Sequence, residues 1–79
     1  MTLASILGKP IEHDRRTVWQ ATTPTADLLA IWRPKCLTFT FYRNRERVVL
    51  DCAAKKSERP DLVLDLVEPA IRAAFGGDL

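Results

Sequence analysis

The sequence of 79 residues contains little of what enzyme active sites and metal centres are built from. It has one histidine, His13, and two cysteines, Cys36 and Cys52, which are far apart and form no CxxC pair. Structural zinc sites need closely spaced ligand pairs, and general bases are most often histidines. His13 stands between Glu12 and Asp14 in an expected loop, where adjacent side chains point apart. We therefore expect no catalytic site, metal site or cofactor, and a protein that is not an enzyme.

Glycine and long apolar stretches are also scarce. The only adjacent glycines, Gly76 and Gly77, stand near residue 79, so no glycine-rich phosphate loop opens a helix. No run approaches the roughly 20 apolar residues of a membrane helix, and the first residues lack the pattern of a signal peptide. Secreted domains of this size usually carry more cysteines. These absences predict one small soluble domain over residues 1–79, in the cytoplasm, with both thiols reduced.

What the sequence does contain is a strong alternation of apolar and polar residues between positions 37 and 52. The apolar members are Leu37, Phe39, Phe41, Val48, Leu50 and Cys52. A hairpin that pairs Phe41 with Val48 places all six on one face, and a slip by one residue would destroy this agreement. The same register places Cys36 and Cys52 on opposite faces, which argues against a disulfide between them.

Two further strands are expected before this hairpin. A tight turn at Arg33 and Pro34 would pair Trp32 with Lys35, and a turn at residues 23–26 would pair Thr22 with Asp27. The core face would then also carry Thr17, Trp19, Ala21, Leu28, Ala30 and Trp32. The competing interpretation is a short helix over residues 26–32, which Ala, Asp and Leu favour locally.

The second clear element is a C-terminal helix. Pro60 and Asp61 suit its first turn, Pro69 is expected to kink it, and Gly76 suits its C-terminal cap. Its expected apolar face comprises Val63, Leu66, Val67, Ala70 and Ala74, flanked by Leu62 and Ile71. Its expected solvated face comprises Asp61, Asp65, Glu68 and Arg72. The fold class is therefore α+β: an antiparallel β-meander of three to four strands packed against this helix, with a short helical turn over residues 2–7.

The basic residues converge once they are placed on the meander. Residues 1–60 contain eleven Lys and Arg against six Asp and Glu, and residues 61–79 contain one against four. One end of the sheet gathers what we call the basic edge: Arg15, Arg16, Arg33, Lys35, Lys55, Lys56 and Arg59. The opposite end carries Arg43, Arg45 and Arg47 beside Tyr42, the one aromatic side chain expected to point outward. Both clusters suit phosphate groups or an acidic protein surface.

The outer face of the sheet is expected to be more apolar than a solvated face requires. It carries Val18, Leu29, Ile31, Thr38, Thr40, Tyr42 and Val49. Either Leu3, Ile6 and Leu7 cover part of it, or it is a contact face for a partner or for a second copy of the chain.

These surfaces favour a non-catalytic binding protein that docks on a larger protein or nucleoprotein complex and modulates it, most simply as an inhibitor. In its small size and lack of motifs the chain resembles the inhibitor and accessory proteins that phages and mobile elements encode, anti-CRISPR proteins among them. The resemblance covers no aligned stretch. The alternative is a small nucleic-acid-binding regulatory protein that uses the basic edge, although the scarcity of outward aromatics and the acidic helix weigh against it.

Overall fold

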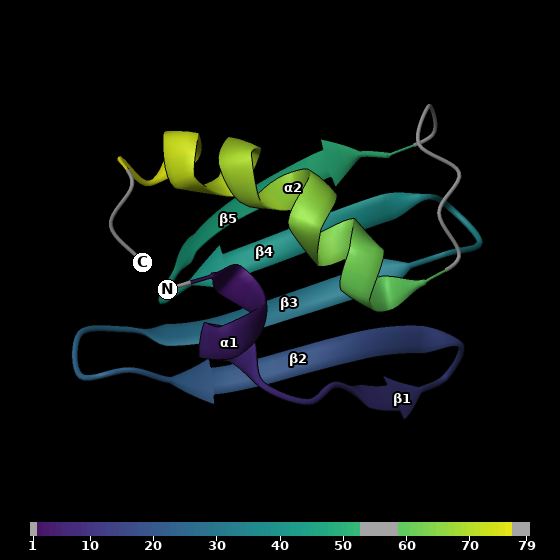
Figure 1. Ribbon diagram of the computed structural model, residues 1–79, viewed down its shortest axis with the longest axis horizontal. Helices are drawn as coiled ribbons and strands as arrows, with labels where there is room; N and C mark the ends of the chain where they lie inside the picture. Colours follow the sequence, from purple (N-terminus) through teal and green to yellow (C-terminus); the bar gives the residue numbers. More distant parts are fainter. Residues whose placement is uncertain (1, 53–58, 77–79) are drawn as a thin grey trace.

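In the computed structural model, which describes residues 2–52 and 59–76, five strands form one antiparallel sheet and two helices lie on one of its faces (Figure 1). In chain order the elements are α1 (Leu3–Leu7), β1 (Ile11–His13), β2 (Arg16–Thr22), β3 (Asp27–Arg33), β4 (Thr38–Arg43), β5 (Glu46–Asp51) and α2 (Pro60–Ala74). The strands follow one another across the sheet in the order β1-β2-β3-β4-β5. The expected α+β meander is confirmed, with five strands where three to four were predicted.

The strand that the sequence did not indicate is β1. It pairs with β2, so that Ile11 lies opposite Val18 and His13 opposite Arg16. His13 is therefore in a strand, and the loop expected for it is wrong. Two-residue hairpin turns usually contain glycine or asparagine at positions of positive φ. Here Asp14 and Arg15 occupy those positions, with φ of 50° and 62°, so no turn signal marks the hairpin.

The registers of the longer hairpins follow the alternation of apolar residues. Thr22 lies opposite Asp27, and Phe41 opposite Val48, as predicted. The alternative helix over residues 26–32 is wrong, because β3 spans most of that segment. The β3–β4 connection is also longer than predicted, since Trp32 lies opposite Phe39 and not Lys35. This shift is an even number of residues, so every side chain keeps its expected face.

The core lies between the sheet and the two helices. Its buried members from the sheet include Trp19, Leu28, Ala30, Trp32, Phe39 and Phe41. Its buried members from the helices are Leu3, Leu7, Val63, Leu64, Val67 and Ile71. Four large aromatic side chains in so short a chain fill much of the space that a small domain has for burial.

The packed face of α2 differs from the predicted one. Leu64 and Ile71 are buried beside Val63 and Val67, whereas Leu66 is 44% exposed. Ala70 and Ala74 are also exposed, so the helix is rotated relative to the expected apolar face. The helix continues through Pro69 to Ala74, and Gly76 follows it with a φ of 69°. The reason for the rotation is that α2 packs against α1 as well as against the sheet.

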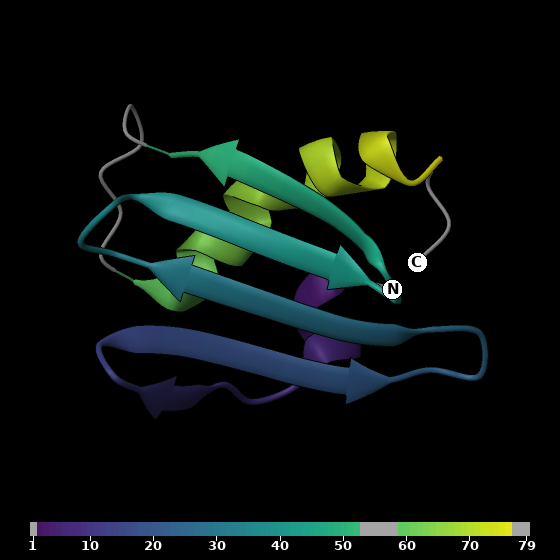
Figure 2. The same ribbon diagram turned by 180° about the vertical axis from the view of Figure 1, so that it is seen from behind.

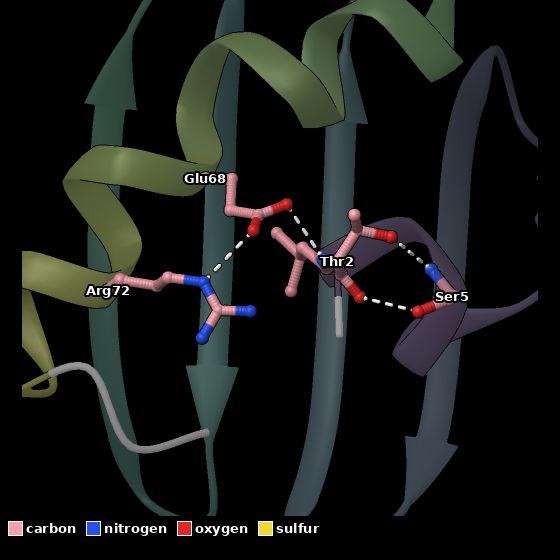
Figure 3. Close-up of polar contacts among 5 residues, drawn as sticks. Thr2, Ser5, Glu68 and Arg72 are labelled. Atoms are coloured by element: carbon pink, nitrogen blue, oxygen red, sulfur yellow. Dashed lines mark hydrogen bonds and ion pairs between the residues drawn. The ribbon is translucent and has the colours of Figure 1, made fainter.

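Glu68 joins the two helices, although it was predicted to lie on a solvated face (Figure 3). Its Oε1 accepts a hydrogen bond from the backbone N–H of Leu3 at 2.7 Å, and its Oε2 accepts one from Nε of Arg72 at 2.9 Å. The first N–H groups of a helix have no partner within the helix, so the carboxylate completes the start of α1. The hydrogen bond from Leu3 is the largest cause that lowers the pKa of Glu68; burial opposes it and Arg72 adds to it.

Candidate binding surface

The sheet face turned away from the helices is covered by none of the described residues (Figure 2). Leu3 and Leu7 belong to the core on the other face, and Ile6 packs against that core, so the predicted cover by the N-terminal segment is wrong. Because directly paired residues share a face, one row of side chains crosses all five strands of the outer face. This apolar row consists of Ile11, Val18, Ile31, Thr40 and Val49.

The two ends of the apolar row are its most accessible parts. Ile11 is 67% exposed and Val49 is 54% exposed, and both lie on edge strands. Thr40, which lies between Ile31 and Val49 in the row, is only 4% exposed, and its hydroxyl accepts a hydrogen bond from Nη1 of Arg33 at 3.0 Å. The outer face therefore combines a half-buried middle with apolar side chains displayed at both margins.

A pocket of about 160 Å³ lies beside this face, where the β1–β2 and β3–β4 turns come together. We call it the basic pocket. It is lined by Asp14, Arg15, Arg16, Arg33, Lys35 and Cys36. The structure thus brings together the four cations of the basic edge that were predicted to converge from these turns. In the part of the chain that the structure describes, none of the four forms an ion pair. Their binding to a partner stays a prediction.

Of the remaining residues of the basic edge, only Arg59 is described by the structure, and it does not line this pocket. Lys55 and Lys56 lie outside the described residues. Arg59 precedes α2 and forms an ion pair with Asp61, with 2.9 Å between Nη2 and Oδ2. Both of these side chains are largely exposed, so water screens the pair.

The second predicted cluster, at the β4–β5 turn, does not form one surface. Arg43 lies opposite the buried Leu28, and its guanidinium carbon is 5.9 Å from the centre of the Phe75 ring, on the helix side of the sheet. Arg45 and Arg47 are exposed. Arg47 pairs with the half-buried Tyr42, and both belong to the outer face.

Cys36 and Cys52 are free thiols: Cys36 is exposed in the β3–β4 turn and not on a face of the sheet, and Cys52 is buried. Within residues 2–52 and 59–76, no three side chains of the metal-ligating types lie close enough together to hold an ion. The candidate site is accordingly a surface with one small basic pocket.

One residue of this surface, Ile11, had no place in the predicted one. Ile11 is the only apolar residue of β1, so the strand shows no alternation. The one available signal was that a hairpin centred on Asp14 and Arg15 would set Ile11 against Val18. A turn without glycine concealed that hairpin.

Neither helix of the described chain has the length and apolarity needed to cross a lipid bilayer. Comparison of the chain with protein-family models, curated proteins and solved structures finds no match. The functional argument therefore starts from the surface itself.

Proposed function

We propose that this chain is a non-catalytic binding protein that docks on a larger protein through the outer face of its sheet and modulates that protein as an inhibitor. The observation that carries the proposal is the apolar row, whose margins Ile11 and Val49 are more than half exposed on a face that no described element covers. Exposed apolar patches with a polar rim are typical of protein interfaces.

The charges around the apolar row favour an acidic partner. Among the described residues, the outer face and its adjoining turns carry six cations: Arg15, Arg16, Arg33, Lys35, Arg45 and Arg47. They carry three carboxylates: Asp14, Asp27 and Asp51. A second copy of the chain would bring the same excess of cations against itself. A protein surface with an apolar centre and surrounding carboxylates complements this face better.

The dimensions of the molecule fit one such interface. The sheet is seen face-on in Figure 1, along the shortest axis, and the two longer axes measure 32 and 24 Å. They bound a face of about 770 Å², and a protein interface of standard size covers about 800 Å² on each partner.

Nucleic acid fits this surface less well. Tyr42 is the only aromatic side chain on the described outer face, and it is half-buried. Single-stranded nucleic acids are usually held by exposed aromatic rings on which bases stack. The exposed Asp61 and Asp65 of α2 would also repel a phosphate backbone. The proposed compartment is the cytoplasm, which two free thiols in one small domain support.

The experiment uses a partner captured by cross-linking in the native host and then purified. Val49→Asp places a carboxylate in the apolar row. We expect calorimetry to show at least a tenfold loss of affinity, since an apolar residue that the partner would bury is replaced by a charge. Leu66→Asp is the matched control, because Leu66 is exposed to a similar degree on α2. It should leave the affinity unchanged.

Two results would overturn this proposal. The first is a loss of affinity in Leu66→Asp with none in Val49→Asp, which would place the interface on α2. The second is tight binding of DNA or RNA by the chain alone, with an affinity that falls steeply with salt concentration. That result would replace a protein partner with a nucleic acid.

A further inference from the structure

We infer that the basic pocket is a binding site for a single phosphate dianion. The inference goes beyond the proposed function, because the site would bind inorganic phosphate whether or not the outer face docks on a protein. It rests on the charge of the pocket, on the fixed position of one arginine, on the backbone at another, and on the volume.

The charge of the pocket is not balanced by the protein. Arg15, Arg16, Arg33 and Lys35 line it together with one carboxylate, that of Asp14, which leaves a formal charge of +3. No ion pair within the described residues involves any of the four cations. Like charges gathered at one place repel one another, and an anion bound between them removes that repulsion.

One of the four cations is held in place before any ligand arrives. Arg33 donates from Nη1 to the hydroxyl of Thr40, which is almost fully buried in the middle of the sheet. This bond occupies one of the five guanidinium N–H donors. The planar fork of an arginine matches the spacing of phosphate oxygens, and a fork that is already positioned loses less freedom on binding.

The second cation, Arg15, has a positive φ, a backbone conformation that favours glycine. Arg15 has a φ of 62° in a two-residue hairpin turn, and glycine is strongly preferred at this position. The Arg15 side chain is exposed, and no hydrogen bond or ion pair of the described chain engages it. The fold therefore gives no reason for a long cationic side chain there, whereas an anion in the pocket does.

The volume selects the size of the ligand. Pockets for cofactors and other organic ligands usually occupy about 300–1,000 Å³, and this one has about 160 Å³. It accommodates one phosphate group more readily than a whole nucleotide. The formal charge of +3 also favours a dianion over the single charge of a nucleic-acid phosphodiester.

The test is a titration of the full chain with inorganic phosphate at about pH 8, at constant ionic strength, followed by NMR. We expect saturable shifts confined to the amides of residues 14–16, 33, 35 and 36. Arg15→Gly should weaken binding roughly tenfold, because one charge-assisted contact is lost. Its melting temperature should not fall, since glycine suits the turn, so weaker binding cannot be attributed to unfolding.

Arg45→Gly is the matched control. Arg45 is the second turn residue of the β4–β5 hairpin, at the opposite end of the sheet, and its loss removes the same charge from the protein, although Arg45 does not share the positive φ of Arg15. Phosphate affinity should be unchanged in this variant. An equal loss in both variants would show that phosphate responds only to net charge, and would overturn the site.

Two further ligands test the chemistry. Acetate at the same ionic strength should not reproduce the shifts; if it does so with equal affinity, the pocket does not select a dianion and the inference fails. A single-stranded oligonucleotide that binds more tightly than phosphate and also shifts Arg45 and Arg47 would overturn the single site in favour of a nucleic-acid track. The phosphate and acetate results are obtained without a protein partner and are independent of the docking proposal.

Discussion

The two faces of the sheet are made from alternate residues of the same strands, yet they are specified in different ways. The inner face carries Trp19, Trp32, Phe39 and Phe41, all at most 1% exposed beneath the helices. The outer face carries smaller side chains, with Ile11 and Val49 in contact with water. The comparison teaches that burial of large rings on the inner face holds the fold together, whereas the exposed residues of the outer face are available for the proposed docking.

The largest effect should separate the two faces directly. Phe39→Ala removes a fully buried ring and should lower the free energy of unfolding by about 3–5 kcal/mol, whereas Val49→Ala should change it by less than about 0.5 kcal/mol. Urea denaturation of both variants measures the difference. Comparable losses in the two would mean that the outer face also holds the fold together.

A smaller loss of stability is expected when the hydrogen bonds of Glu68, which join α1 and α2, are weakened. Glu68→Gln removes the ion pair with Arg72 and weakens the bond from Leu3, so we expect a loss of about 1–2 kcal/mol. Because folding lowers the pKa of Glu68, its stabilisation is complete above its ordinary pKa and is lost as the pH falls from there through the lowered pKa of the folded state. Melting temperatures of both proteins between about pH 7 and pH 3 should converge on acidification. Asp65→Asn, on an exposed residue of α2, is the control.

The two buried tryptophans allow a finer comparison within the inner face. Nε1 of Trp32 is buried without a hydrogen-bond partner in the described structure, which is unfavourable for an N–H group. Trp32→Phe removes this donor together with some volume, so it should be less destabilising than Trp19→Phe by about 1 kcal/mol. Denaturant titrations of the pair test this. A larger loss in Trp32→Phe would indicate that the indole N–H is satisfied in solution.

The smallest expected effect has the opposite sign. Arg15→Gly relieves a side chain at positive φ and should raise the free energy of unfolding by about 0.5–1 kcal/mol. Thermal melting at low phosphate concentration measures it. A clear decrease would show that Arg15 supports the fold, and its place in the basic pocket would then need no ligand to explain it.

Much of the fold could be predicted because a shift of the strand register by an even number of residues leaves every side chain on the same face of the sheet. Trp32 was matched with the wrong partner, yet it keeps its face opposite Phe39. The convergence of Arg16 and Arg33 followed from the antiparallel order of the strands, because β2 begins and β3 ends at the same end of the sheet. These inferences needed only alternation along the chain.

The errors have a common physical origin in contacts between distant segments. α2 has apolar residues on more than one side, so its own pattern could not decide whether Leu64 or Leu66 is buried. The choice depends on α1, whose Leu3 bonds to Glu68. The strand β1 was missed because it is short and mostly polar, and it exists only as a neighbour of β2.

The hydrogen bond between Leu3 and Glu68 also determines when α1 can be stabilised during synthesis of the chain. It joins positions 65 residues apart, whereas the hairpins of the meander join near neighbours. On the ribosome, β2 to β5 can pair as soon as they emerge, but Leu3 has no acceptor for this bond until Glu68 has been translated. A five-residue helix is not stable alone, so α1 is stabilised only after the residues of α2 that it contacts are available. By the same reasoning it should open first in the native protein, and hydrogen exchange at the amide of Leu3 should be faster than at the central strands.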